Sequence, residues 1–328
     1  MYRHKDERSV EAICYEQDHV QKVLSKIKEK FMDYINDFIE LEAGCGISQK
    51  TVEKIAKGLG IQEVKIKKSK NTSQKFKNII KEAINDFEKD RRKYIAIFDE
   101  KALEEYKDDP LGFKSTVLRN DCPIIHATLY NKRAKELDKY RYEFNISDAN
   151  ELLDVVTNLY YFGRDYYDNF YDQDKYDEID NYEDLKISDL DTEDYTVYGV
   201  IGGGIKSHML YKVYPAVFPN RSRDALWAMW YLTGKQTFGC KMDSEFLMID
   251  VEQSITQQNY FYPYELFAFY AHQIYQLLKQ KAIENDVYID PEYRYVVVDT
   301  FLSFVAKQHE DEISFLKQQI KDGGYDYA

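Results

Sequence analysis

The stretch PYELFAFYAHQIYQLLKQKAIEN, residues 263–285, decides the fold because it predicts a helix that is apolar on nearly every side. No glycine or second proline interrupts it after Pro263. Its large apolar side chains are Leu266, Phe267, Phe269, Tyr270, Ile274, Leu277 and Leu278. A helix of this kind is stable only when other elements cover it. We therefore expect residues 263–285 to form the buried centre of a helical core.

Amphipathic helices are predicted on both sides of this centre in the sequence. Residues 16–42 and residues 73–89 repeat apolar side chains at steps of three and four, which is the period of one helix face. Asp148 and Ser222 stand directly before two further helical patterns and are typical N-cap residues. A last helix is expected to start at Asp290 and to end before Gly323 and Gly324.

Short apolar runs predict a few small strands between these helices. The runs are YIAIF (94–98), CPIIHATLY (122–130), YTVYGVI (195–201) and a hairpin of QTFGCK (236–241) with SEFLMIDV (244–251). The run YVVV (295–298) could be a strand or part of the last helix. The fold class expected is therefore α+β and helix-dominated, with mostly amphipathic helices and small β elements in two lobes.

An acidic segment suggests where those lobes meet. Residues 163–195 contain 13 Asp and Glu, many tyrosines and few aliphatic side chains, so we expect a sparsely packed linker. The alternative is a surface that binds a protein partner. The predicted parts are an N-terminal helical lobe (1–145) with a basic segment (64–81) and a C-terminal mixed lobe (146–328).

The charge is unevenly distributed along the chain. Residues 1–140 hold 29 Lys and Arg against 25 Asp and Glu, although the whole chain has 45 against 58 and a net charge of −13. The 30 tyrosines are explained either by the codon usage of an AT-rich prokaryotic or phage genome or by base stacking. The charged start and the lack of a long apolar run predict a cytoplasmic protein that does not enter a membrane.

The basic segment is the first candidate site. Residues 64–81 carry seven lysines and no acid, so Lys65, Lys67, Lys68, Lys70, Lys75 and Lys77 are candidates to neutralise phosphates of DNA or RNA. The preceding GISQKTVEKIAKGLGI (46–61) resembles one helix of a helix-turn-helix domain, which would imply DNA binding. The alternative is a solvated helix end with a lysine-rich loop. Nucleic-acid association is the leading functional hypothesis.

A second candidate site would bind phosphate. The run GVIGGGIKS (199–207) differs from a Walker A loop because Ile205 separates Gly204 from Lys206. The site would comprise Gly203, Gly204, Lys206, His208, Arg221 and Arg223. The alternative is a tight turn in which these cations form internal salt bridges.

A third candidate site is a set of carboxylates. Asp243, Glu245, Asp250 and Glu252 flank one predicted strand and could be catalytic by holding magnesium and a nucleophilic water. The pattern resembles the metal-binding hairpin of restriction-type nucleases, from which it departs because no lysine lies two residues after an acid. The alternative is an ordinary acidic hairpin. The sequence leaves open whether the protein is an enzyme.

Overall fold

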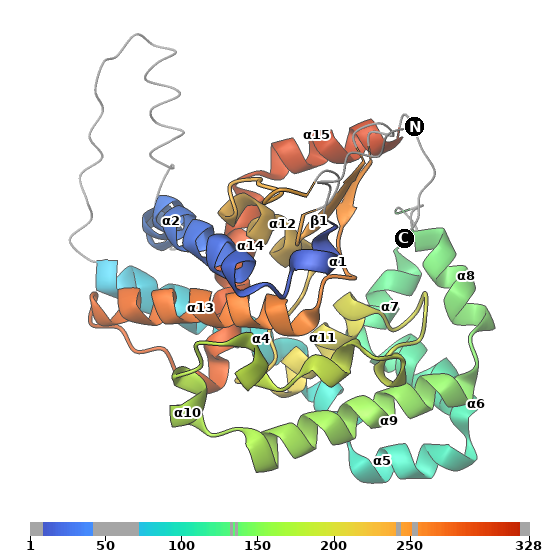
Figure 1. Cartoon of the computed structure of the whole chain (residues 1–328). Coiled ribbons are helices and arrows are strands. Elements are labelled where there is room, and N and C mark those ends of the chain that lie inside the picture. Colours follow the sequence, from blue (N-terminus) through green and yellow to red (C-terminus); the bar gives the residue numbers. More distant parts are fainter. Residues whose placement is uncertain are drawn as a thin grey trace, which may run out of the picture.

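The computed structural model describes residues 9–41, 72–131, 134, 137–240, 244–250 and 255–321. Helices make up most of these ranges, and their strands form one two-stranded sheet (Figure 1). The prediction of a helix-dominated fold is confirmed. None of the helices within these ranges combines the length and the apolar character that a membrane span requires.

The described part of the chain forms helices up to residue 165, and helices with two short strands from residue 166 on. The first part comprises α1 (Val10–Ile13), α2 (Gln17–Leu41), α4 (Thr72–Ile97), α5 (Glu100–Glu105), η1 (Tyr106–Asp108), α6 (Pro110–Gly112), η2 (Phe113–Asp121), α7 (Pro123–Tyr130), α8 (Asp138–Ile146) and α9 (Ala149–Asp165). The second part comprises η4 (Tyr166–Phe170), α10 (Gln173–Asp177), η5 (Tyr182–Leu185), η6 (Ser188–Asp191), η7 (Glu193–Tyr195), α11 (Gly203–Val213), α12 (Arg223–Leu232), β1 (Leu247–Asp250), β2 (Ile255–Gln258), α13 (Tyr264–Ile283), η8 (Pro291–Tyr293), α14 (Arg294–Lys307) and α15 (Glu310–Lys321).

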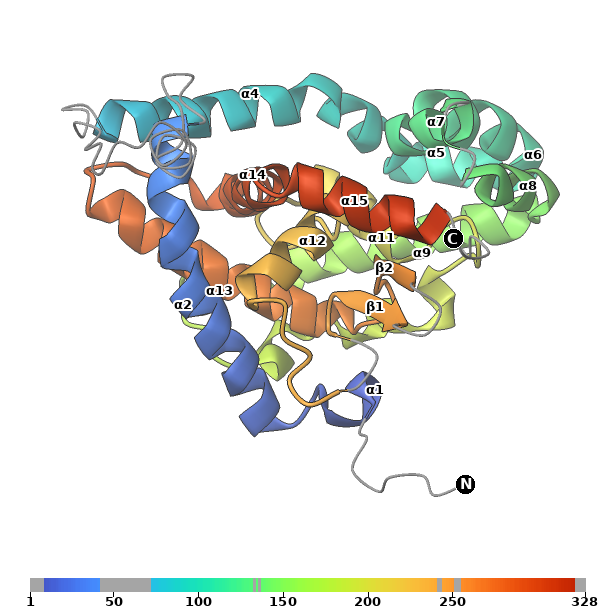
Figure 2. The same ribbon diagram turned by 90° about the horizontal axis from the view of Figure 1, so that it is seen from above.

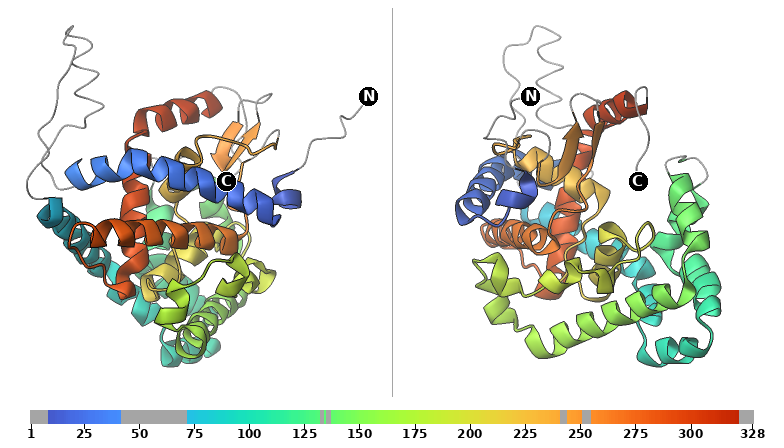
Figure 3. Two further views of the ribbon diagram at one scale, coloured as in Figure 1. Left: turned by 60° about the vertical axis from the view of Figure 1, so that its left-hand side comes forward. Right: turned by 45° about the vertical axis from the view of Figure 1, so that its right-hand side comes forward.

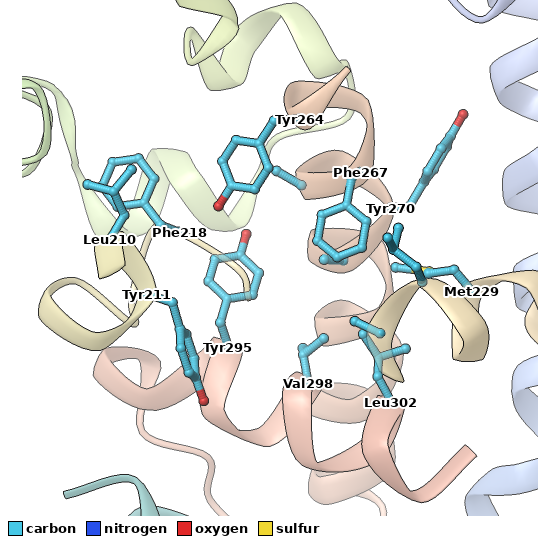
Figure 4. Packing of buried hydrophobic residues seen from close by; sticks show 14 of the residues in the cluster. Leu210, Tyr211, Phe218, Met229, Tyr264, Phe267, Tyr270, Tyr295, Val298 and Leu302 are labelled. Atoms are coloured by element: carbon cyan, nitrogen blue, oxygen red, sulfur yellow. The ribbon is translucent and has the colours of Figure 1, made fainter. Parts of the chain in front are cut away.

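Helix α13 lies at the centre of the fold, as its sequence predicts. Helices α2 and α14 pack against it, and Figure 3 shows α2 and α13 side by side. Side chains from α11, α12, α13 and α14 converge in the core, where Phe267 of α13 lies near Val298 of α14 (Figure 4). Because neighbours cover α13 on several sides, the apolar surface that its sequence places all round the helix is removed from water.

Two predicted strands are helical instead. The run YIAIF belongs to the end of α4, where Tyr94 and Ile97 are buried. The helix therefore continues past Lys89, because these residues extend its apolar face. The run CPIIHATLY forms α7, which has Pro123 in its first turn, a position where the missing proline N–H is tolerated.

The end of the chain and the predicted hairpin also differ from expectation. The run YVVV lies inside α14, and the expected last helix is divided into η8, α14 and α15. Strand β1, from the run SEFLMIDV, pairs antiparallel with β2, so that Leu247 faces Gln258. The run QTFGCK contributes no strand in its described part, residues 236–240. The run YTVYGVI forms a turn closed by a single bridge between Val197 and Ile201.

The expectation that the acidic segment 163–195 is sparsely packed is wrong. It forms a series of short helical turns, of which η5 and η6 pack against α13. Its buried side chains are Tyr166, Tyr176, Tyr182, Leu185, Ile187 and Leu190. Tyrosine rings supply the apolar surface that the scarce aliphatic residues do not. Their hydroxyl groups bond to the main chain: that of Tyr166 donates to the Leu185 carbonyl oxygen at 2.7 Å, and that of Tyr176 to the Val217 carbonyl oxygen at 3.0 Å.

Helices from both predicted lobes contribute to one hydrophobic cluster. Helix α2 packs against α12, α13 and α14, and α4 packs against α11 and α14. Residues 1–145 and residues 146–328 are thus joined through several helix contacts besides the acidic segment. The independence of the two parts as folding units stays a prediction.

The packing of the acidic segment can be tested by removing one of its rings. We expect Tyr176→Ala to lower the free energy of unfolding by about 3–5 kcal/mol, the usual cost of truncating a buried aromatic residue. Tyr288 is 77% exposed, so Tyr288→Ala should change stability by no more than about 0.5 kcal/mol. Chemical denaturation of both variants measures the difference, and equal stabilities would contradict the packing described.

Candidate nucleic-acid interface

Part of the predicted basic segment lies on α4. Lys65, Lys67, Lys68 and Lys70 lie outside the described residues. Lys75 lies near the start of α4, where its Nζ is 2.7 Å from Glu40 Oε2 on α2. Lys75 therefore ties α4 to α2, whereas Lys77 is exposed to solvent.

The outward face of α4 carries a row of cations. The apolar positions of the helix, including Phe76, Ile80 and Phe87, face the core. The opposite face bears five exposed cations, listed here as Lys77, Lys81, Lys89, Arg92 and Lys93, against two exposed acids, Glu82 and Asp86. Lys77 with Lys81, and Lys89 with Arg92, are four and three residues apart and so share a helix face. The five cations together span about 24 Å of the helix at ~1.5 Å per residue. We call these five residues the α4 stripe.

Most cations of the α4 stripe are exposed and have no partner among the described residues that would keep them from contacting a ligand. Lys89 forms an exposed ion pair with Asp86 on its own helix, which contributes little to stability. Within the described ranges, Lys77, Lys81 and Arg92 form no ion pair or side-chain hydrogen bond. Helix α4 runs along one margin of the molecule in Figure 2, with no other helix outside it. The stripe is therefore an accessible row in which exposed cations outnumber exposed acids, with Glu82 and Asp86 between Lys81 and Lys89 and the partly exposed Glu88 and Asp90 beside it.

The predicted phosphate residues are placed differently. Lys206 on α11 is 4% exposed and donates hydrogen bonds to the Leu190 carbonyl oxygen and, at 3.1 Å, to Thr196 Oγ1. Arg221 is 1% exposed and donates to the Tyr262 carbonyl oxygen. Burial lowers the pKa of Lys206 to about 8, while the nearby Asp191 carboxylate acts in the opposite direction. Both cations already have acceptors inside the protein.

The other members of the predicted phosphate site contact protein side chains or lie at the surface. Gly203, in the first turn of α11, lies against the Arg221 guanidinium, and a Cβ atom there would come within 2.1 Å of Arg221 Nη2. Gly204 lies against the ring of Tyr260. His208 packs edge-on against the ring of Tyr94. Arg223 has a side chain that is 60% exposed and lies beside Asp224. The glycines thus make room for protein side chains, and only Arg223 points to solvent.

The predicted carboxylate site is described only in part. Asp243 and Glu252 lie outside the described residues, and Asp250 ends β1 with a side chain that is not described. Glu245 is fully buried, and its Oε1 lies 2.6 Å from Nε2 of His19. Among the described side chains, no three His, Cys, Asp or Glu residues are grouped as metal ligands. Glu245 joins α2 to the segment before β1.

A polar network that we did not predict from the sequence connects α11 and α14. Asp299 Oδ1 accepts a hydrogen bond from Asn220 Nδ2 at 3.0 Å, and its Oδ2 accepts one from the Tyr211 hydroxyl group at 3.5 Å. Asn220 Oδ1 lies 3.3 Å from Nδ1 of His208. Burial raises the pKa of Asp299 to about 7 and lowers the pKa of His208 to about 4. The spacing of these residues along the chain gives no sign that they meet.

The raised pKa of Asp299 makes stability depend on pH. The folded protein keeps a proton on this carboxyl up to about pH 7, whereas the unfolded chain loses it near pH 4. The stabilising contribution of the protonated carboxyl is therefore complete below about pH 4 and is lost as the pH rises through about 7. Asn resembles the neutral acid, so Asp299→Asn should become more stable relative to the wild type as the pH rises from about 5 to 8.

Denaturant unfolding of both proteins at several pH values measures this difference in stability. His208 is present in both proteins, so its titration largely cancels in the difference. Asp154→Asn makes the same chemical change at an exposed position outside this network and provides the control. If the difference in the free energy of unfolding between Asp299→Asn and the wild type does not vary with pH, the pKa of Asp299 is not raised and the prediction is wrong.

Of the six lysines predicted to bind nucleic acid, four lie outside the described residues, Lys75 is paired with Glu40, and Lys77 lies in the exposed α4 stripe. The cations of the phosphate site are divided between the interior and the surface. Comparison with family models, with curated proteins and with solved structures finds no match to this chain.

Proposed function

We propose that the protein binds DNA or RNA through the α4 stripe together with the lysine-rich segment that precedes α4 in the sequence. The observation that carries this proposal is the excess of five exposed cations over two exposed acids on one helix face. A row of cations of this length can contact several successive phosphates, and the release of their counterions would provide much of the binding free energy.

The charge of the rest of the chain limits binding to this face. The net charge of −13 repels a polyanion from most of the surface. A locally positive stripe on an acidic protein therefore orients the nucleic acid as well as attracting it. Gln74, Asn78 and Asn85 are exposed on α4 among the cations and can donate hydrogen bonds to phosphate or sugar oxygens. Contacts of this kind do not read the base sequence.

Three cations of the stripe can be neutralised together. In the variant Lys81→Gln, Lys89→Gln, Arg92→Gln, each lost phosphate contact should reduce the slope of log K against log salt by about 0.9 for duplex DNA or about 0.7 for a single strand. Fluorescence anisotropy with labelled oligonucleotides across a salt series measures this slope. The variant should keep its melting temperature within a few degrees, because the three side chains are exposed.

A matched control removes the same charge elsewhere. The variant Lys101→Gln, Lys175→Gln, Arg223→Gln replaces three exposed cations that lie outside α4, and its slope should equal that of the wild type. An equal reduction in both variants would show a general charge effect and contradict the proposed face. No nucleic-acid binding by the wild type would contradict the function itself.

A second variant tests the segment that precedes α4. Replacing Lys65, Lys67, Lys68 and Lys70 with Ala should also weaken binding and reduce the slope, because the proposal places these lysines on the same phosphate backbone. Anisotropy in the same salt series measures the effect. An unchanged slope would restrict the interface to α4 itself.

A further inference from the structure

An apolar groove lies at the C-terminal end of the α4 stripe. It has a volume of about 330 Å³ and is formed by α4, α5, the neighbouring Tyr106 and η2. Ile97, Leu103 and Phe113 in its lining are buried. Lys93 and Asp121 also line it and are exposed to solvent. The groove thus combines an apolar interior with one positive and one negative group at its edge.

A π-helical turn builds one wall of this groove. Segment η2 is a π-helix, a wider helix that is rare and occurs frequently at functional sites. Its last turn is closed by a hydrogen bond from the Cys122 N–H to the Val117 carbonyl oxygen at 2.8 Å. Phe113, Val117 and Asp121 all line the groove, so one wall changes from buried and aromatic to exposed and charged.

The lining has the chemistry that a nucleobase requires. A base has two flat faces that stack on aromatic and apolar side chains. The half-buried ring of Tyr106 lines the groove and is backed by the buried ring of Phe113, with the two centroids 5.5 Å apart. The edge of a base carries hydrogen-bond donors and acceptors. The Asp121 carboxylate can accept from an exocyclic amine, and the Lys93 ammonium can donate to a ring nitrogen or carbonyl oxygen. Within the described part of the chain, Lys93 and Asp121 form no ion pair with each other.

The position of the groove relates it to the stripe. Lys93 belongs to both, and Lys89 precedes it by one helical turn, about 6 Å along the axis. A strand whose phosphates lie along Lys81, Lys89 and Arg92 therefore passes the mouth of the groove. A base in a duplex is paired and stacked, and reaching a side pocket would cost a few kcal/mol of unstacking. An unpaired base has no such cost.

We propose that this groove takes one unpaired nucleobase of a single strand whose phosphates lie along the α4 stripe. The inference rests on the proposed function and adds to it the preference for single-stranded over duplex nucleic acid. Bases that carry an exocyclic amine fit the Asp121 carboxylate, whereas thymine and uracil have no such group.

The test fills the groove without changing the charge of the stripe. Ala96 lies on α4, lines the groove and is exposed, so Ala96→Phe should occupy the space of the base and leave the fold intact. Ile95, the preceding residue of α4, is 47% exposed and does not line the groove. Ile95→Phe is therefore the matched control. Tyr106→Leu is a second variant that keeps apolar volume but removes the ring on which a base would stack.

Binding is measured with a labelled single strand of about twelve cytosines, as DNA and as RNA, and with a DNA duplex that contains the same strand. We expect the wild type and Ile95→Phe to bind the single strands more tightly than the duplex. Stacking of one base on an aromatic side chain contributes about 5- to 150-fold in affinity, or ~1–3 kcal/mol. Ala96→Phe and Tyr106→Leu should lose this factor on the single strands and keep the salt slope of the wild type.

The outcomes separate this inference from the proposed function. If the wild type binds with a stripe-dependent salt slope, and Ala96→Phe binds single strands as tightly as Ile95→Phe does, the groove takes no base and the inference is wrong while the function stands. If the wild type binds neither single strands nor duplex, the proposed function fails and this inference fails with it. Loss of single-strand affinity in both groove variants, with an unchanged slope, supports the inference.

Discussion

The N-terminus of the central helix α13 imposes a constraint that links distant parts of the chain. The first N–H groups of a helix have no partner within it, and Pro263, at the N-cap position, provides no side-chain hydrogen bond. The acceptor is Asp191 of the acidic segment, whose Oδ2 accepts from the Tyr264 N–H at 2.6 Å. A negative charge at this end of a helix also interacts favourably with the helix dipole. The same carboxylate acts electrostatically on the buried Lys206 and Arg221.

This arrangement explains why an acidic segment can be part of a folded core. Its carboxylates cap helical turns, as Asp172 does for α10 by accepting from the Asp174 N–H at 3.1 Å. Others pair with cations of the core: Asp177 Oδ1 lies 3.0 Å from Nη1 of Arg294, a residue with no exposed surface. A buried guanidinium without an opposite charge would be strongly destabilising. The segment therefore supplies charges that the surrounding helices need.

Local signals in the sequence were sufficient to predict several helices. The period of three and four gave the extent of α2 within a residue or so at each end, and the capping roles of Asp148 and Ser222 are confirmed by hydrogen bonds to the N–H groups of Glu151 and Ala225. The short apolar runs were misassigned because propensity for strands is weak against packing. The bonds of Asp299 to Asn220 and Tyr211 join residues 79 and 88 positions apart, which no local pattern encodes.

The same limit explains why the candidate cations could not be ranked from the sequence. Lys206 and Arg221 stand in a glycine-rich context that suggests phosphate binding, yet they are buried and bonded to main-chain oxygens. Lys81 and Arg92 stand in an ordinary amphipathic helix but face solvent. An interior cation would have to give up its internal acceptors to meet a phosphate, which costs free energy for each bond broken. A hydrated cation on an open face exchanges only water and counterions. Burial, more than residue type, therefore decides which positive charges of this acidic chain can act on a polyanion.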